Sequence, residues 1–142
     1  LIIIGHDNFR PFRRLARRLG VARQLIFFHG RSDIPRFLFA ADLLVHPAYF
    51  ETAGSILLEA LAAGLPVLAS DVCGFSPHVA RSGGGRLVAS PFDQKVFNGL
   101  MADMLVSPRR AQWRRNGIRY VQQTDVFSRA QRAVDMIERL LA

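Results

Sequence analysis

The chain of 142 residues has a single cysteine, Cys73, and a single lysine, Lys95. One cysteine excludes an internal disulfide framework and any zinc site built from several cysteines, and it favours a reducing compartment. Long apolar runs are also missing. The longest, at residues 55–63, is interrupted by Glu59 and falls short of the roughly 20 residues that a membrane-spanning helix needs.

Acidic residues are few as well, with 11 against 19 basic ones, and the net charge is +8. Such an excess can accompany binding to nucleic acid or to an anionic membrane surface. The sequence has no RNP-like run, zinc-finger spacing or basic-leucine region, so we predict no nucleic-acid partner. Hydrophobic residues make up 50% of the chain, which is enough to bury a core and excludes a disordered tail.

Short apolar segments alternate with helical patterns, without an internal repeat or a linker. Strands are expected at residues 1–4, 25–29, 43–46, 66–70 and 85–89. Helices are expected at residues 9–19, 33–41, 53–63, 77–81, 93–106, 108–123 and 128–141. Continuous apolar strands are typical of parallel sheets that helices bury on both faces. We therefore predict one α/β domain over residues 1–142: a Rossmann-like parallel sheet with helices on both faces and a helical tail.

The segment HPAYFETAGSILLE has the strongest chemical signal. It holds two of the three glutamates of the chain, Glu51 and Glu59, eight positions apart. Between them, Ala53, Gly54 and Ser55 place free backbone N–H groups at the start of an expected helix. Free amides and the helix dipole together form a site for an anion such as a diphosphate.

The spacing of these residues leaves two interpretations open. In one, a nucleotide diphosphate sugar lies across the helix start, with its sugar near Glu51 and its ribose near Glu59. Glu59 would lie roughly 9 Å along the helix axis from the start of the helix. In the other, Glu51 is an N-terminal helix charge and Glu59 pairs with an arginine. A glycosidase pair is disfavoured, because nothing directs both carboxylates at one bond.

Both glutamates lie in HPAYFETAGSILLEALAAGLPVLASD, which resembles the E-x7-E signature of the retaining glycosyltransferases of family four. The segments AADLLVHPA and AGLPVLASDVCGF are also similar to that family. HGRSD, HPAYFETAG and PVLASDVCGFSPHVA resemble the subgroup that adds glucose to an inner heptose of the lipopolysaccharide core. The resemblance implies the GT-B fold. Residues 1–142 would then be its C-terminal, donor-binding domain, truncated at the N-terminus and without the acceptor domain.

The resemblance also implies roles for individual residues. Glu51, the catalytic residue of the set, would hold hydroxyls of the transferred sugar, and Glu59 would hold the ribose hydroxyls. Gly30 and Arg31 would border the uracil. The remaining donor contacts would come from the backbone amides of Ala53, Gly54, Ser55 and Ile56.

The same resemblance implies a UDP-sugar donor, most of all UDP-glucose, and a lipopolysaccharide core as the acceptor. It also implies that the reaction needs no cofactor and no metal. The expected location is cytoplasmic, with peripheral contact at the inner face of the bacterial inner membrane. Arginines at 13–18 and 109–119 would meet anionic lipid there. The basic residues that neutralise the leaving diphosphate in this family have no match in the sequence. We therefore expect that the chain alone transfers no glucose from UDP-glucose.

Two other functions stay open at this point. A nucleotide-sugar epimerase domain would use a similar helix start for the diphosphate, without a carboxylate on the sugar. A non-catalytic basic α/β module would bind nucleic acid through its arginines. UDP binding that depends on Glu59 supports the transferase, whereas salt-sensitive DNA binding without UDP affinity supports the module.

The remaining polar and aromatic candidates have mostly structural interpretations. His46 and His29 are expected at strand ends as structural residues, with His29 bonded to backbone, and His6 is the better ligand-side candidate. Cys73 is expected to pack against the donor loop, because no base lies near it in the sequence. Trp113 is expected on a core stripe of its helix.

Overall fold

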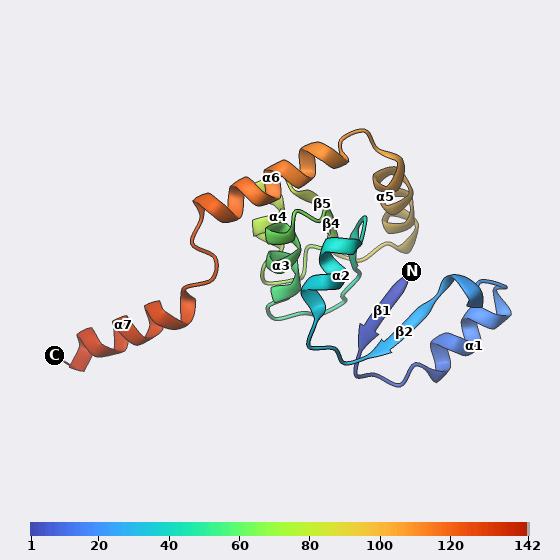
Figure 1. Cartoon of the computed structure of the whole chain (residues 1–142), viewed down its shortest axis with the longest axis horizontal. Helices are drawn as coiled ribbons and strands as arrows, with labels where there is room; N and C mark the ends of the chain where they lie inside the picture. The colour runs from blue at the N-terminus through green and yellow to red at the C-terminus, as the bar shows by residue number, and fades with distance from the viewer. Residues whose placement is uncertain (142) are drawn as a thin grey trace. The chain divides into compact units, whose positions relative to one another are not determined.

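The computed structural model describes residues 1–141, and its elements follow the predicted order closely (Figure 1). The chain divides into two compact units, Leu1–Ile34 and Pro35–Ala142, and each is described by itself. The first unit contains β1 (Ile2–Gly5), α1 (Arg10–Arg18), a 3-10 turn (Ala22–Gln24), β2 (Ile26–His29) and the first residue of α2 (Ile34–Ala40). The second contains the rest of α2, then β3 (Leu44–His46), α3 (Ser55–Ala63), β4 (Val67–Ser70), α4 (Ser76–Ser82), β5 (Gly85–Val88), α5 (Gln94–Val106), α6 (Arg110–Gln123) and α7 (Arg129–Leu141).

In the first unit, β1 and β2 pair in parallel, with Ile3 opposite Phe27. Phe9, just before α1, is buried, and its ring centroid lies 5.1 Å from that of Phe27. The same ring lies 5.1 Å from the imidazole of His29. His29 is exposed and stacks on Phe9, so the expectation that it bonds to backbone from a buried strand is wrong.

In the second unit, β3, β4 and β5 form a parallel sheet in that order. Only β4 is buried at every position; β3 is half-buried throughout, and β5 is exposed at Arg86 and buried only at Val88. The expectation that all strands are buried on both faces therefore holds for β4 alone. The reason is its place in the sheet, because β4 has a strand on each side and helices on both faces.

Helices cover both faces of this sheet, as predicted. Leu68 and Val88 pack against Phe97 and Met104 of α5, and all four side chains are buried. Successive side chains of a strand alternate between faces, so the neighbours of Leu68 in β4 point the other way. On that side lie α3, α4 and α6, which contact one another, and Leu61 of α3 is fully buried there.

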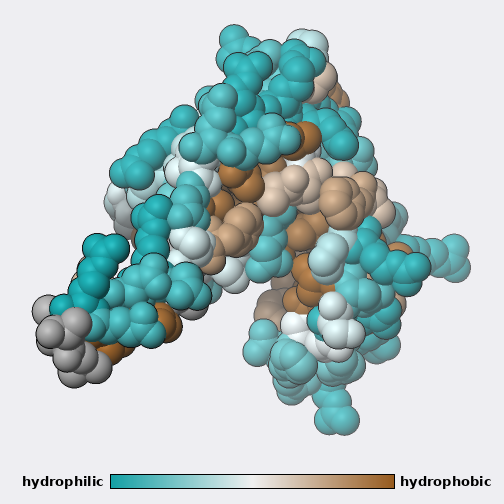
Figure 2. Space-filling model, turned by 60° about the vertical axis from the view of Figure 1, so that its left-hand side comes forward, coloured by the Kyte–Doolittle hydropathy of each residue, from teal (hydrophilic) through white to brown (hydrophobic). Residues whose placement is uncertain are grey.

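The chain ends in α6 and α7, which confirms the predicted helical tail. In Figure 2, hydrophilic side chains cover most of the visible face of α7, at the lower left. Among residues 1–141, no helix combines the length and the apolar composition needed to cross a membrane. The second unit thus provides a sheet covered by helices whose strand ends can support a site.

Candidate functional site

The motif loop, residues 47–54, lies at the carboxyl end of β3 against the turn that follows β4. Glu51 and Cys73 form an isolated parallel β-bridge between the two segments. The Phe75 amide donates a hydrogen bond to the Ala53 carbonyl at 2.9 Å. The two segments therefore support each other through their backbones, where the ligands of open parallel sheets usually bind.

Two glycines allow this close packing. Gly54 has φ +77°, a left-handed conformation that side chains rarely adopt, and it directly precedes α3. Gly74 lies so close to the motif loop that a Cβ atom there would be 2.2 Å from the Thr52 carbonyl oxygen. Any larger residue at position 74 would push the two segments apart.

The start of α3 carries the backbone amides that the sequence singled out. The helix begins at Ser55 and not at Ala53, because Gly54 interrupts the helical conformation. The Ala53 amide donates to Oε1 of Glu51 at 3.1 Å. In the part of the chain that the structure describes, the amides of Gly54, Ser55 and Ile56 have no hydrogen-bond acceptor. Three of the four predicted amides are thus available to a ligand.

Glu59 lies one turn further along α3, about 6 Å along the axis from Ser55. It is half-buried, as is Glu51. Among the side chains that the structure describes, neither carboxylate has an arginine or lysine within ion-pair distance. The interpretation in which Glu59 pairs with an arginine is therefore wrong, and the carboxylate is free to accept hydrogen bonds from hydroxyl groups.

Cys73 is 2% exposed and packs beside the motif loop, as predicted. Burial raises the pKa of its thiol; a hydrogen bond with Ser70 lowers it, and the negative charges of Glu51 and Asp71 raise it. The net direction is upward, so the thiol stays protonated at neutral pH. A protonated, buried thiol is a poor nucleophile, which leaves Cys73 a structural role.

His46 is the feature of this region that sequence reasoning undervalued. Its ring nitrogen Nε2 is buried, and no group among residues 1–141 forms a hydrogen bond with it. A buried polar atom without a partner costs about 1–3 kcal/mol. The signal in the sequence was a histidine within the otherwise apolar run LLVHPA.

Gly30 and Arg31 lie in the first unit, on the loop after β2. A Cβ atom on Gly30 would be 1.9 Å from Cε1 of His6, so that imidazole lies directly over the glycine. Arg31 forms a bidentate ion pair with Asp33, with Nε–Oδ1 and Nη2–Oδ2 distances of 2.8 Å each. This hydrogen bonding raises the pKa of Arg31 and fixes the plane of its guanidinium.

No three metal-ligating side chains lie together in the described part of the chain. The expectation that the reaction needs no metal stays a prediction.

Three comparisons place this geometry beside known proteins. Residues 1–120 match the family model described as "Glycosyl transferases group 1". The chain is 43% identical over 138 residues to the lipopolysaccharide glucosyltransferase WaaG of Escherichia coli, covering 96% of this chain and 37% of that protein.

Solved structures agree with the sequence comparison. The crystal structure of WaaG, a glycosyltransferase involved in lipopolysaccharide biosynthesis, matches with a TM-score of 0.93 at 42% identity, over 96% of this chain and 37% of that one. HepE of Anabaena in complex with UDP matches with a TM-score of 0.78 at 24% identity, over 97% and 40% of the two chains, which shows the fold alone. The chain thus spans little more than a third (37%) of the curated relative.

Proposed function

This chain belongs to the group 1 glycosyltransferases, and we propose that it binds the diphosphate of a UDP-sugar at the start of α3. The observation that carries the proposal is the set of three amides that have no acceptor in the described part of the chain, those of Gly54, Ser55 and Ile56. They lie at the positive end of the helix dipole, where phosphate groups bind readily. The backbone contacts with the turn after β4 hold this helix start in place.

The two carboxylates would bind the sugars on either side of the diphosphate. The Ala53 amide holds one oxygen of Glu51, and the other can accept a hydrogen bond from the transferred sugar. Glu59 has no ion pair with a described side chain, so both of its oxygens can accept from the vicinal hydroxyls of the ribose. Gly30 and Arg31 would border the uracil. The two hydrogen bonds to Asp33 fix the orientation of the Arg31 guanidinium.

For the complete enzyme we infer retaining transfer of a hexose, with glucose as the leading sugar and a lipopolysaccharide core heptose as the acceptor. The name of the E. coli relative supports this class of substrate. The protein would act by orienting the donor and stabilising the departing diphosphate, without a metal. Its arginine-rich segments would hold it at the inner face of the bacterial inner membrane. The family match favours this function over the epimerase and nucleic-acid alternatives.

Isothermal titration calorimetry with UDP and uridine tests the proposal. UDP is expected to bind at least about tenfold more tightly than uridine, because only UDP places a diphosphate on the amides of α3, and tenfold corresponds to about 1.4 kcal/mol. Equal affinities, or no binding of UDP, would contradict the proposal. Salt-sensitive binding of duplex DNA by a chain without UDP affinity would favour the basic module instead.

We also propose that Nε2 of His46 forms a hydrogen bond with the bound donor. The variant His46→Leu removes a buried polar atom that has no partner in the described residues. Its free energy of unfolding is therefore expected to stay equal or rise by about 1 kcal/mol. UDP-glucose binding is expected to weaken severalfold in the same variant. Thermal denaturation and calorimetry measure the two effects, and a destabilised variant with unchanged donor affinity would contradict the assignment.

A further inference from the structure

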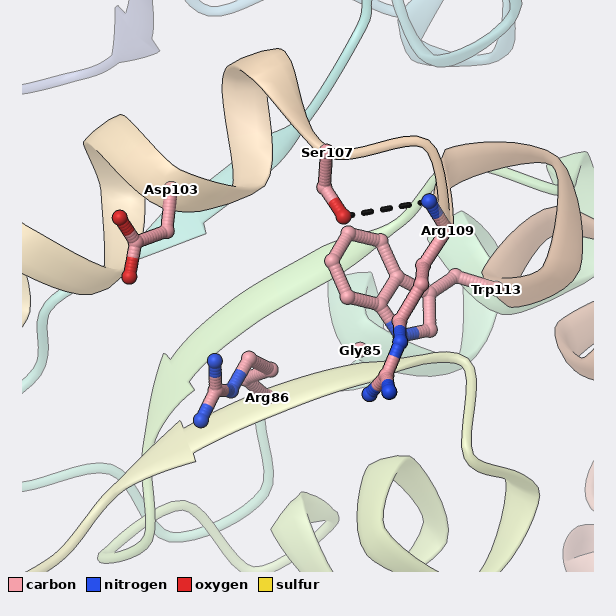
Figure 3. Close-up of a pocket in the computed structure, with 6 residues that line it drawn as sticks. All are labelled: Gly85, Arg86, Asp103, Ser107, Arg109 and Trp113. Atoms are coloured by element: carbon pink, nitrogen blue, oxygen red, sulfur yellow. Dashed lines mark hydrogen bonds between the residues drawn. The ribbon is translucent and has the colours of Figure 1, made fainter.

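A cavity of about 410 Å³ lies at the amino end of β5 (Figure 3). Its lining consists of Gly85, Arg86, Asp103, Ser107, Arg109 and Trp113. The strands of this sheet are parallel, and Gly85 is the first residue of β5. The cavity is therefore at the edge of the sheet opposite the motif loop, which follows the carboxyl end of β3. Its volume falls in the range of small-molecule pockets, about 300–1,000 Å³.

The charged side chains of this cavity have no side-chain partners among the residues that the structure describes. In the described residues, Arg86, Arg109 and Asp103 take part in no side-chain ion pair or hydrogen bond. By contrast, Arg110, which follows Arg109 in the chain, forms an ion pair with Asp42, with an Nη2–Oδ1 distance of 2.5 Å. Two guanidinium groups and one carboxylate leave the lining with an excess of positive charge.

The tryptophan gives the cavity a fixed apolar wall. Trp113 is half-buried and packs against the core cluster that contains Leu68 and Met104. In the view of Figure 3, the Arg109 side chain overlaps the Trp113 ring, whereas Arg86 on β5 and Asp103 on α5 lie to the other side. The Arg109 amide donates to Oγ of Ser107 at 3.1 Å, which fixes the turn that leads into α6.

We propose that this cavity binds the phosphate group of a phosphorylated sugar. Guanidinium groups bind phosphate oxygens in a bidentate geometry, and the two that line this cavity have no ion pair with any described residue. Phosphate alone would leave much of the volume unfilled, whereas a sugar ring can pack against the face of Trp113. The cavity and the proposed donor site lie at opposite edges of the sheet, so UDP is not expected to compete for the cavity.

Trp113 provides a specific readout, because it is the only tryptophan of the chain. The experiment titrates the chain with glucose 6-phosphate and with inorganic phosphate, at constant ionic strength, while recording tryptophan fluorescence. A saturable change is expected with both probes. Arg86→Gln and Arg109→Gln are each expected to weaken binding about tenfold, since each removes a charge-assisted hydrogen bond to the phosphate. Arg115→Gln, an exposed arginine of α6 outside the lining, is the matched control and should change nothing.

Asp103→Asn offers a test in the opposite direction. Removing the one negative charge of the lining is expected to tighten phosphate binding severalfold. Tighter binding of glucose 6-phosphate than of phosphate supports the sugar phosphate, and equal affinities reassign the site to free phosphate. A response that never saturates, or that persists in the double arginine variant, overturns the proposal. The donor-site variant Glu59→Ala should keep the full phosphate response, which separates the two sites.

Discussion

Replacing Glu59 with alanine is expected to weaken UDP binding by about 10- to 100-fold, because hydrogen bonds to a charged group contribute about 1.5–3 kcal/mol. The substitution should leave the fold intact. Glu59 has no ion pair in the described residues, and alanine is a strong helix former at a position inside α3. Calorimetric titration with UDP gives the affinity, and circular dichroism gives the stability.

The matched control is Glu138→Ala, which removes the same charge from an exposed position in α7. It is expected to bind UDP as tightly as the unaltered chain. Loss of affinity in both variants would mean that net charge, and not a contact with the ribose, causes the effect. Unchanged affinity in Glu59→Ala would remove Glu59 from the site while leaving the amides of α3 to be tested separately.

Replacing Gly74 with alanine is expected to reduce UDP affinity at least about tenfold and to lower the free energy of unfolding by about 1–3 kcal/mol. The added Cβ would lie 2.2 Å from the Thr52 carbonyl oxygen, which is backbone and cannot rotate away. The motif loop must therefore move, and with it the bridge between Glu51 and Cys73. The chain is still expected to fold, because Gly74 lies in an exposed turn outside the core.

Gly99→Ala is the control for this substitution. Gly99 lies inside α5, and a Cβ there would meet no heavy atom within 4 Å. Alanine is expected to stabilise the helix by about 0.5–1 kcal/mol and to leave UDP binding unchanged. If Gly74→Ala behaves like Gly99→Ala, the two segments do not depend on each other and the described support of the motif loop is wrong.

The start of α3 illustrates how far sequence reasoning reached into the site. The pattern located the helix and both glutamates, because apolar periodicity and the E-x7-E spacing are local properties. It placed the first residue of the helix at Ala53, two residues too early. The left-handed φ of Gly54 decides that boundary, and the amide of Ala53 turns instead to Glu51.

The sequence pattern did not predict contacts between distant segments. The Phe75 amide meets the Ala53 carbonyl, and Nδ1 of His78 lies 2.7 Å from the Tyr120 hydroxyl, 42 positions along the chain. Trp113 was interpreted as a core residue, yet one side of its ring also lines a cavity with Arg86. The periodicity of one helix does not predict which residues of other elements pack next to it.

By itself, then, the order of residues determined the elements, their parallel α/β class and the family, because apolar periodicity, glycine and proline positions and short motifs act over a few neighbours. Only the tertiary structure decided which side chains keep an unmet charge or hydrogen bond. Within the described residues, Glu59 has no arginine partner, Nε2 of His46 has no hydrogen-bond partner, and the arginines near Trp113 have no ion pair. Each of these depends on the packing of segments far apart in the chain.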